Sequence, residues 1–134
     1  MPARMNARFD IGVDPARDLV RIRLGGFFSP DDLGAFMPEF RRAYAELRCG
    51  PNEHLTLVDV RELAIQSQGA VAQFAALLAD PRFHARRLAC VAACTLARSQ
   101  LNRALAARRD ARVFAEPADA EAWVLAAGPV SRAA

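Results

Sequence analysis

The sequence has 134 residues, of which 53% are hydrophobic and 25% are charged, and its net charge is only +3, a composition typical of one globular domain. No apolar run approaches the roughly 18 residues that cross a bilayer, residues 1–7 lack the apolar stretch of a signal peptide, and three cysteines imply no disulfide framework. We therefore expect a cytoplasmic protein without a transmembrane segment, built as a single domain over 1–134 with its core at about 8–125 and a loose tail at 126–134.

The chain opens with the pattern of a β-hairpin. Apolar residues alternate with polar ones in Arg8–Asp14 and again in Val20–Leu24, which is the period of strands with one wet face. The intervening Asp14–Arg17 contains a proline and is typical of a turn. We expect these two strands to pair toward one edge of a sheet.

The first helix has a clear beginning and an interruption. Ser29 precedes Pro30 and two acidic residues, the arrangement of an N-cap, a first-turn proline and charges that favour the helix dipole. Apolar residues then recur at three- and four-residue spacing up to Leu47. Pro38 falls inside this helix and predicts a kink or a restart there.

Strands and helices alternate through the rest of the chain. The apolar pattern predicts strands and helices over these ranges: strands at Leu55–Val60, Leu88–Cys94 and Arg112–Ala115, and helices at Gly69–Ala79, Leu96–Arg109 and Pro117–Leu125. In the second helix, Val71, Phe74, Leu77 and Leu78 are expected to face inward. The order is β-β-α-β-α-β-α-β-α, which favours an α/β fold with a single-layer, mixed but mostly parallel five-stranded sheet and about four helices.

With these elements in place, the chain resembles the STAS-like and SpoIIAA-like domains, which share the STAS and CRAL-TRIO type of fold. The resemblance spans about residues 8–125 and depends on the order of four segments: Leu24–Asp32 after the hairpin, Phe36–Phe40 with its internal proline, Leu57–Leu63 leading into the helix at Gly69, and Arg112–Phe114 followed by the Trp-bearing helix Glu116–Val124.

The resemblance implies a non-enzymatic regulatory or protein-interaction module. In the anti-sigma-factor antagonists of the family, a serine just before the corresponding glycine is phosphorylated. Aligning that glycine with Gly69 places the phosphorylated position on Gln68, which cannot accept phosphate, and leaves Ser67 one residue away. We expect a protein partner to dock on the turn Gln66–Gly69 and the helix after it. Ser67 is either a displaced phosphorylation site or simply the cap of that helix.

Asp59 lies near the carboxyl end of a central strand, where ligands gather in open α/β sheets. It could orient a partner or a polar ligand group. It could equally bond to Arg61 or to nearby amides and only fix the end of the strand.

A run of phenylalanines gives the alternative function, a carrier or sensor of a small apolar or anionic, lipid-like ligand. The candidate pocket residues are Phe27, Phe28, Phe36 and Phe40. Core packing would explain most of them. An extended Phe27–Phe28 pair cannot bury both rings in one direction, so a homodimer through an apolar patch is also plausible.

The remaining polar residues suggest little chemistry. All 18 basic Lys and Arg residues are arginine, and the region Arg82–Arg112 is rich in them, which predicts a solvated surface with at most weak anion binding. Few aromatic residues interleave, so specific nucleic-acid binding is not expected. His54 and His84 are expected in exposed loops, and Cys90 and Cys94 in a strand. No spacing predicts a metal, a cofactor or a nucleophile–base pair.

Overall fold

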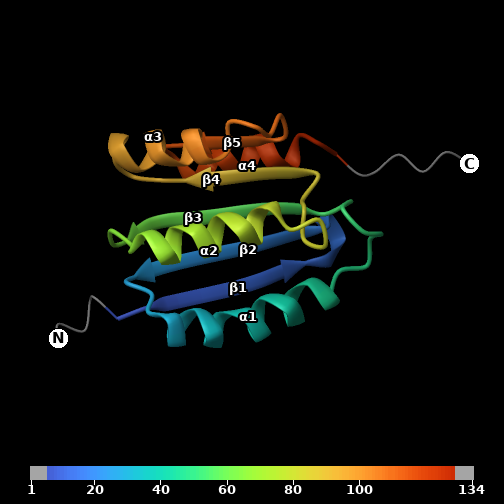
Figure 1. Cartoon of the computed structure of the whole chain (residues 1–134). Coiled ribbons are helices and arrows are strands. Elements are labelled where there is room, and N and C mark those ends of the chain that lie inside the picture. The colour runs from blue at the N-terminus through green and yellow to red at the C-terminus, as the bar shows by residue number, and fades with distance from the viewer. Residues whose placement is uncertain (1–5, 129–134) are drawn as a thin grey trace, which may run out of the picture.

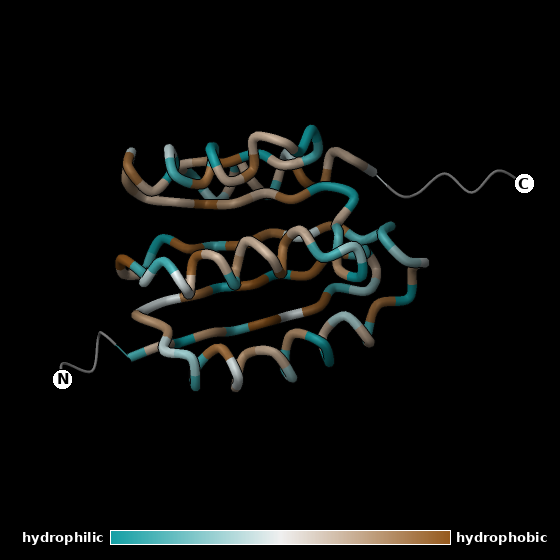
Figure 2. The backbone as a smooth tube through the Cα atoms, viewed as in Figure 1, coloured by the Kyte–Doolittle hydropathy of each residue, from teal (hydrophilic) through white to brown (hydrophobic). Residues whose placement is uncertain are grey.

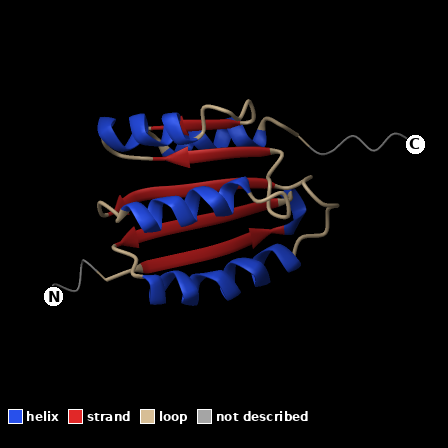
Figure 3. Cartoon of the chain, in the orientation of Figure 1, coloured by secondary structure: helices blue, strands red, loops and turns tan. Residues whose placement is uncertain are grey.

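The computed structural model describes residues 6–128 as one sheet with helices on both faces (Figures 1 and 3). The strands are β1 (Arg8–Asp14), β2 (Leu19–Gly26), β3 (Leu55–Leu63), β4 (Arg87–Val91) and β5 (Ala111–Phe114). The helices are α1 (Pro30–Ala45), α2 (Gln68–Ala79), α3 (Thr95–Ala104) and α4 (Pro117–Leu125), with a 3-10 turn at Pro15–Arg17.

The sheet confirms the predicted fold class. Its order is β1-β2-β3-β4-β5, with β1 antiparallel to β2 and every later pair parallel. Because crossovers between neighbouring parallel strands are right-handed, the three helices that connect β2 through β5 share one face. Within residues 6–128 no strand follows α4, which covers part of the other face.

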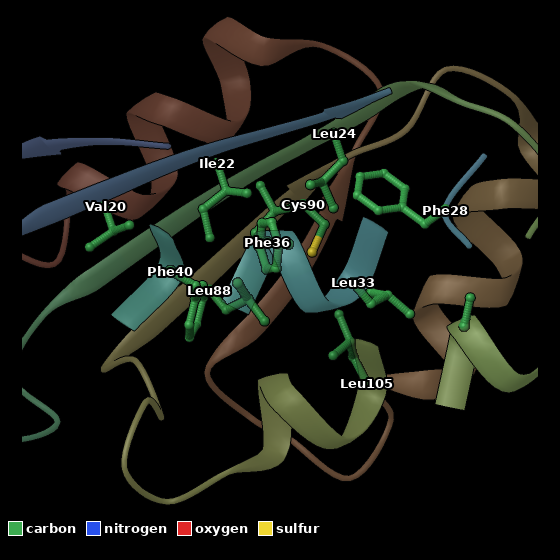
Figure 4. Close-up of a cluster of buried hydrophobic side chains, with 12 residues drawn as sticks. Val20, Ile22, Leu24, Phe28, Leu33, Phe36, Phe40, Leu88, Cys90 and Leu105 are labelled. Atoms are coloured by element: carbon green, nitrogen blue, oxygen red, sulfur yellow. The ribbon is translucent and has the colours of Figure 1, made fainter. Parts of the chain in front are cut away.

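Two hydrophobic clusters hold these layers together. The larger joins the sheet to α1, α2 and the end of α3; its buried members include Phe28, Phe36 and Phe40 (Figure 4). The smaller lies under α4, where Ala120 and Val124 pack on the opposite face of the sheet. Both clusters draw on β3 and β4, which is why these strands are apolar on both faces.

The caps of α1 form as the sequence predicts, but its proline acts differently. Ser29 Oγ accepts a hydrogen bond from the Asp32 N–H at 3.2 Å, and the Asp32 carboxylate accepts one from the Ser29 N–H at 2.8 Å, a capping box. Helix α1 continues through Pro38 without the restart that was expected. Pro38 is exposed there, and the packed apolar face on either side of it keeps the helix continuous.

Two predictions are wrong: the end of the strand that contains Cys90, and the exposure of His54. The strand ends at Val91, not at Cys94, and Cys94 is an exposed residue whose sulfur caps α3. The apolar run predicted too long a strand, because Ala92 is buried although it lies beyond the end of β4. His54 is not an exposed loop residue: it is only 3% exposed, and its ring packs edge-on against Tyr44 at 4.7 Å.

Candidate functional site

Gln66 joins the two loops that follow β2 and β3. Its side-chain oxygen accepts a hydrogen bond from the Phe28 N–H at 2.9 Å, and its Nε2 donates to the carbonyl oxygens of Gly26 at 2.9 Å and Ala64 at 2.6 Å. One side chain therefore satisfies three main-chain groups at the carboxyl ends of neighbouring strands. The predicted interaction turn is held in place by its first residue.

Replacing Gln66 with alanine is expected to lower the free energy of unfolding by about 1–3 kcal/mol, because partly buried main-chain groups lose their partners. Urea unfolding followed by circular dichroism measures the change. Gln73→Ala is the matched control, since Gln73 is exposed on α2 and should shift stability by less than about 0.5 kcal/mol. Equal midpoints for the two variants would show that the Gln66 hydrogen bonds do not support the fold.

Ser67 and Gly69 lie at the surface at the start of α2. Ser67 Oγ accepts a hydrogen bond from the Ala70 N–H at 3.1 Å, which is the capping role that the sequence allowed. Ser67, Gln68 and Gly69 are exposed. These three residues of the turn are therefore accessible to a partner, whereas the side chain of Gln66 is already hydrogen-bonded to the main chain.

Helix α2 exposes most of its apolar residues. Val71 is 51% exposed, which corrects the prediction that it faces inward, and Ile65 before the helix is 90% exposed. Ala70 is the one buried residue of the helix; Phe74, Leu77 and Leu78 are partly buried. Ala64–Ala79 contains no charged residue, and most of α2 is tan in Figure 2. We call the exposed part of Ile65–Ala79 the α2 surface.

Asp59 lies on the other face of the sheet, away from the α2 surface. Its carboxylate accepts hydrogen bonds from the Arg61 main-chain N–H at 3.0 Å and from the Arg61 guanidinium at 2.7 Å. Partial burial raises the pKa of Asp59, but these hydrogen bonds and the charge of Arg61 outweigh burial and leave that pKa below its ordinary value. This is the structural role that the sequence left as one of two alternatives.

The face around Asp59 is hollowed and polar, a feature that sequence reasoning missed. Two shallow hollows of about 230 and 240 Å³ adjoin there. Their charged lining residues are Asp10, Arg21, Arg23, Asp59, Arg61, Glu62 and Glu121. The alternation of Arg21 and Arg23 in the second strand was the available signal, since it marks the face of the sheet that α4 covers only in part.

The four candidate pocket phenylalanines lie elsewhere and pack against one another or their neighbours. Phe28, Phe36 and Phe40 are each only 1% exposed, and the ring of Phe36 lies 5.6 Å from that of Phe40 and 6.5 Å from that of Phe28. Phe27 is partly buried. Neither hollow is lined by these residues, and Phe28, Phe36 and Phe40 belong to the buried core.

The arginines of the region Arg82–Arg112 are mostly bound within the fold. Main-chain carbonyl oxygens accept hydrogen bonds from four of them: Arg86, Arg87, Arg98 and Arg108. Arg82 pairs with Asp80, and Arg112 lies over the ring of Phe114. Within residues 6–128, the side chains of two of the eight have no hydrogen bond, ion pair or ring contact: Arg103 and Arg109. The contacts restrict how most of these guanidinium groups could bind an anion, although the carbonyl oxygens do not neutralise their charge.

Two further features complete the description of residues 6–128. No group of three or more His, Cys, Asp or Glu side chains in this part of the chain is arranged to hold a metal ion. None of its helices has the length and apolar character that crossing a membrane requires.

Among the solved structures that this chain resembles is one that it matches over most of its length. It is the crystal structure of an uncharacterised protein from the DUF3478 family with a SpoIIAA-like fold, from Shewanella loihica PV-4. The two share 20% sequence identity with a TM-score of 0.72, and the match covers 89% of this chain and 95% of the other. No protein-family model matches the sequence, and no curated protein matches it. The chain has the SpoIIAA-like, STAS-like fold that its sequence predicts.

Proposed function

We propose that this protein is a non-enzymatic interaction module that binds a protein partner through the α2 surface. The observation that carries the proposal is the exposure of Ile65, just before α2, and of Val71 on α2, in a segment with no charged residue. Exposed apolar surface of this kind marks interaction sites on folded proteins. The three hydrogen bonds from the Gln66 side chain to the main chain of the neighbouring loops, which we call the Gln66 clamp, support the same role. They hold the turn rigid, and a rigid surface loses less entropy on binding.

The chemistry around Asp59 supports the non-enzymatic half of the proposal. Its carboxylate is bonded to Arg61, and the hollow beside it is lined by charged residues without a histidine or a cysteine. A nucleophile needs a base within hydrogen-bonding reach.

Phosphorylation of Ser67 stays a prediction of the family resemblance. The Ser67 hydroxyl has a structural role even without phosphorylation, because it caps α2 by accepting a hydrogen bond from the Ala70 N–H.

Val71→Glu tests the α2 surface directly. The variant places a charge in the middle of the apolar surface and should weaken partner binding by about 10-fold or more, as loss of a buried apolar contact does at interfaces. Tagged wild type and variant would be purified from the native host and their co-purifying proteins quantified by mass spectrometry.

Ala118→Glu is the matched control for this experiment. Ala118 is exposed in the first turn of α4, on the opposite face of the sheet, where an added acid suits the helix dipole. A stoichiometric protein retained by wild type and Ala118→Glu but lost from Val71→Glu supports the proposal. Retention of the partner by wild type and both variants would show that the partner does not bind through Val71 on α2.

A further inference from the structure

Strand β5 forms one edge of the sheet, at the top of Figure 1, with α3 on one of its faces and α4 on the other. The carbonyl oxygen of Asp110 accepts a hydrogen bond from the Leu88 N–H at 2.8 Å. That of Phe114 accepts one from the Ala92 N–H at 3.0 Å. Because alternate residues of a strand bond to the same neighbour, Arg112 also faces β4, between these two.

The residues that alternate with these face outward. The N–H and C=O groups of Ala111 and Val113 point away from β4, and no hydrogen bond reaches them within residues 6–128. Open main-chain groups at the edge of a sheet can pair with a further strand. In recognition by strand addition, these main-chain hydrogen bonds provide the affinity, and the side chains on the two faces provide the specificity.

The positive charge of the protein is concentrated at this edge. Thr95–Phe114, which forms α3, β5 and the loop between them, contains five arginines and one acidic residue, a net charge of +4. The whole chain carries only +3. Arg103, Arg109 and Arg112 are exposed, and the side chains of the first two have no hydrogen bond or ion pair within residues 6–128. The edge therefore favours an acidic partner.

The two faces of β5 differ in character. Arg112 and Phe114 lie on the face that carries α4, where the Arg112 guanidinium lies 5.2 Å from the centre of the Phe114 ring. Ala111 and Val113 lie on the other face, where they pack against the larger cluster and remain partly exposed. A strand added beside β5 would therefore meet a cationic side chain on one face and apolar side chains on the other.

We propose that β5 binds an extended segment of a protein partner in which acidic residues alternate with apolar ones, paired antiparallel to β5. The acidic side chains lie beside Arg112, and the apolar side chains lie beside Val113. Residues directly opposite each other share a face, so an apolar residue of the partner exchanges both main-chain hydrogen bonds with Val113. The antiparallel direction is the more stable of the two per residue.

The opposite edge of the sheet does not suit such a partner. Strand β1 carries Asp10 and Asp14, which would repel an acidic segment, and α1 packs against it through the rings of Phe9 and Phe36 at 5.3 Å. At β5, an extended segment needs the width of only one strand, about 4.8 Å. Such a segment brings no helix of its own that would collide with α3 or α4.

The inference goes beyond the proposed function, and either can fail alone, because the α2 surface belongs to the helix that connects β3 and β4. A strand pair as short as Ala111–Phe114 buries less than a standard interface of about 1,600 Å². We therefore expect a dissociation constant on the order of 10–100 µM.

Synthetic peptides test the pairing without altering the protein. The probe is a short fluorescein-labelled peptide of alternating glutamate and valine, titrated with the full chain and followed by fluorescence anisotropy. Replacing its glutamates with lysine should weaken binding by about 10-fold or more. N-methylation of the valines removes the N–H groups that face β5 and should abolish binding, whereas N-methylation of the glutamates leaves those groups in place and should preserve it.

Charge reversal on the protein tests the location. Arg112→Glu should weaken binding of the glutamate–valine peptide by about 5-fold or more, because carboxylates then meet across the pair. Arg41→Glu is the matched control: Arg41 is exposed on α1, and the change in net charge is the same. It should alter binding by less than about 2-fold, since distant exposed charges are screened by salt.

Amide exchange followed by NMR gives a second readout. The amide protons of Ala111 and Val113 should exchange more slowly when the peptide is bound, because they become hydrogen-bonded. Absence of binding at about 1 mM protein, well above the expected dissociation constant, overturns the proposal. So does an equal loss of binding in Arg112→Glu and Arg41→Glu, or unchanged exchange at both amides. Binding that survives N-methylation of the valines but not of the glutamates would overturn the antiparallel pairing.

Discussion

Phe36→Ala is expected to lower the free energy of unfolding by about 3–5 kcal/mol, the cost of deleting a buried phenylalanine side chain. Phe36 is 1% exposed, and its ring lies 5.3 Å from that of Phe9, 5.6 Å from that of Phe40 and 6.1 Å from that of Phe74. It thus joins β1, α1 and α2 at one point of the larger cluster. Domains of this size are stable by only about 5–15 kcal/mol, so the variant should be close to unfolding at 37 °C.

Chemical denaturation at 15 °C measures this loss, with Phe27→Ala as the matched control. Phe27 is the same residue type and lies immediately after β2, but it is only partly buried. Its truncation should cost less than half as much, since less area returns to water. If the two variants lost equal stability, the centre of the core would not lie at Phe36.

The features predicted correctly from sequence were those with local causes. The hairpin follows from alternation in Arg8–Asp14, and the start of α1 follows from the Ser29 and Asp32 capping box. Both signals act between residues close in the chain, where spacing alone determines the geometry. The mostly parallel sheet then followed from the alternation of strands and helices, which requires right-handed crossovers.

The features missed were those that distant residues decide. Val71 has the spacing of an inward residue, but α2 lies so that Ala70 is buried in its place. Gln66 became a clamp only because β2 and β3 are neighbours and bring Gly26 and Phe28 within its reach. Local patterns cannot report such contacts, since the partners are separated by about 40 residues of chain.

His54 is the third such residue, and its burial predicts a pH-dependent stability. It lies immediately before the apolar strand β3, where Tyr44 packs against its ring, and its Nε2 has no hydrogen-bond partner within residues 6–128. Burial is the main cause that lowers the pKa of His54 to about 4. In the unfolded chain the ordinary value is about 6.5, so the unfolded state binds the proton more readily at intermediate pH.

Stability should therefore be highest above pH 6.5 and should fall as the pH drops toward 4. The difference between the two pKa values corresponds to a loss of about 3 kcal/mol across that window. Asp59 and Asp110 contribute at lower pH, because their hydrogen bonds to arginine leave their pKa values below the ordinary value despite partial burial. The slope between pH 6.5 and 4.5 is thus assigned to histidine.

His54→Phe should remove most of this slope. Phenylalanine keeps the aromatic contact with Tyr44 and cannot titrate, and the unpartnered Nε2 means that no hydrogen bond is lost at that atom. His84→Asn is the control: His84 is partly exposed and bonds to Asp110 at 2.9 Å, so wild type and this variant should keep the slope. Urea midpoints measured from pH 7 to 4.5 distinguish the cases, and a slope unchanged in His54→Phe would show that the pKa of His54 is the same in the folded and unfolded protein.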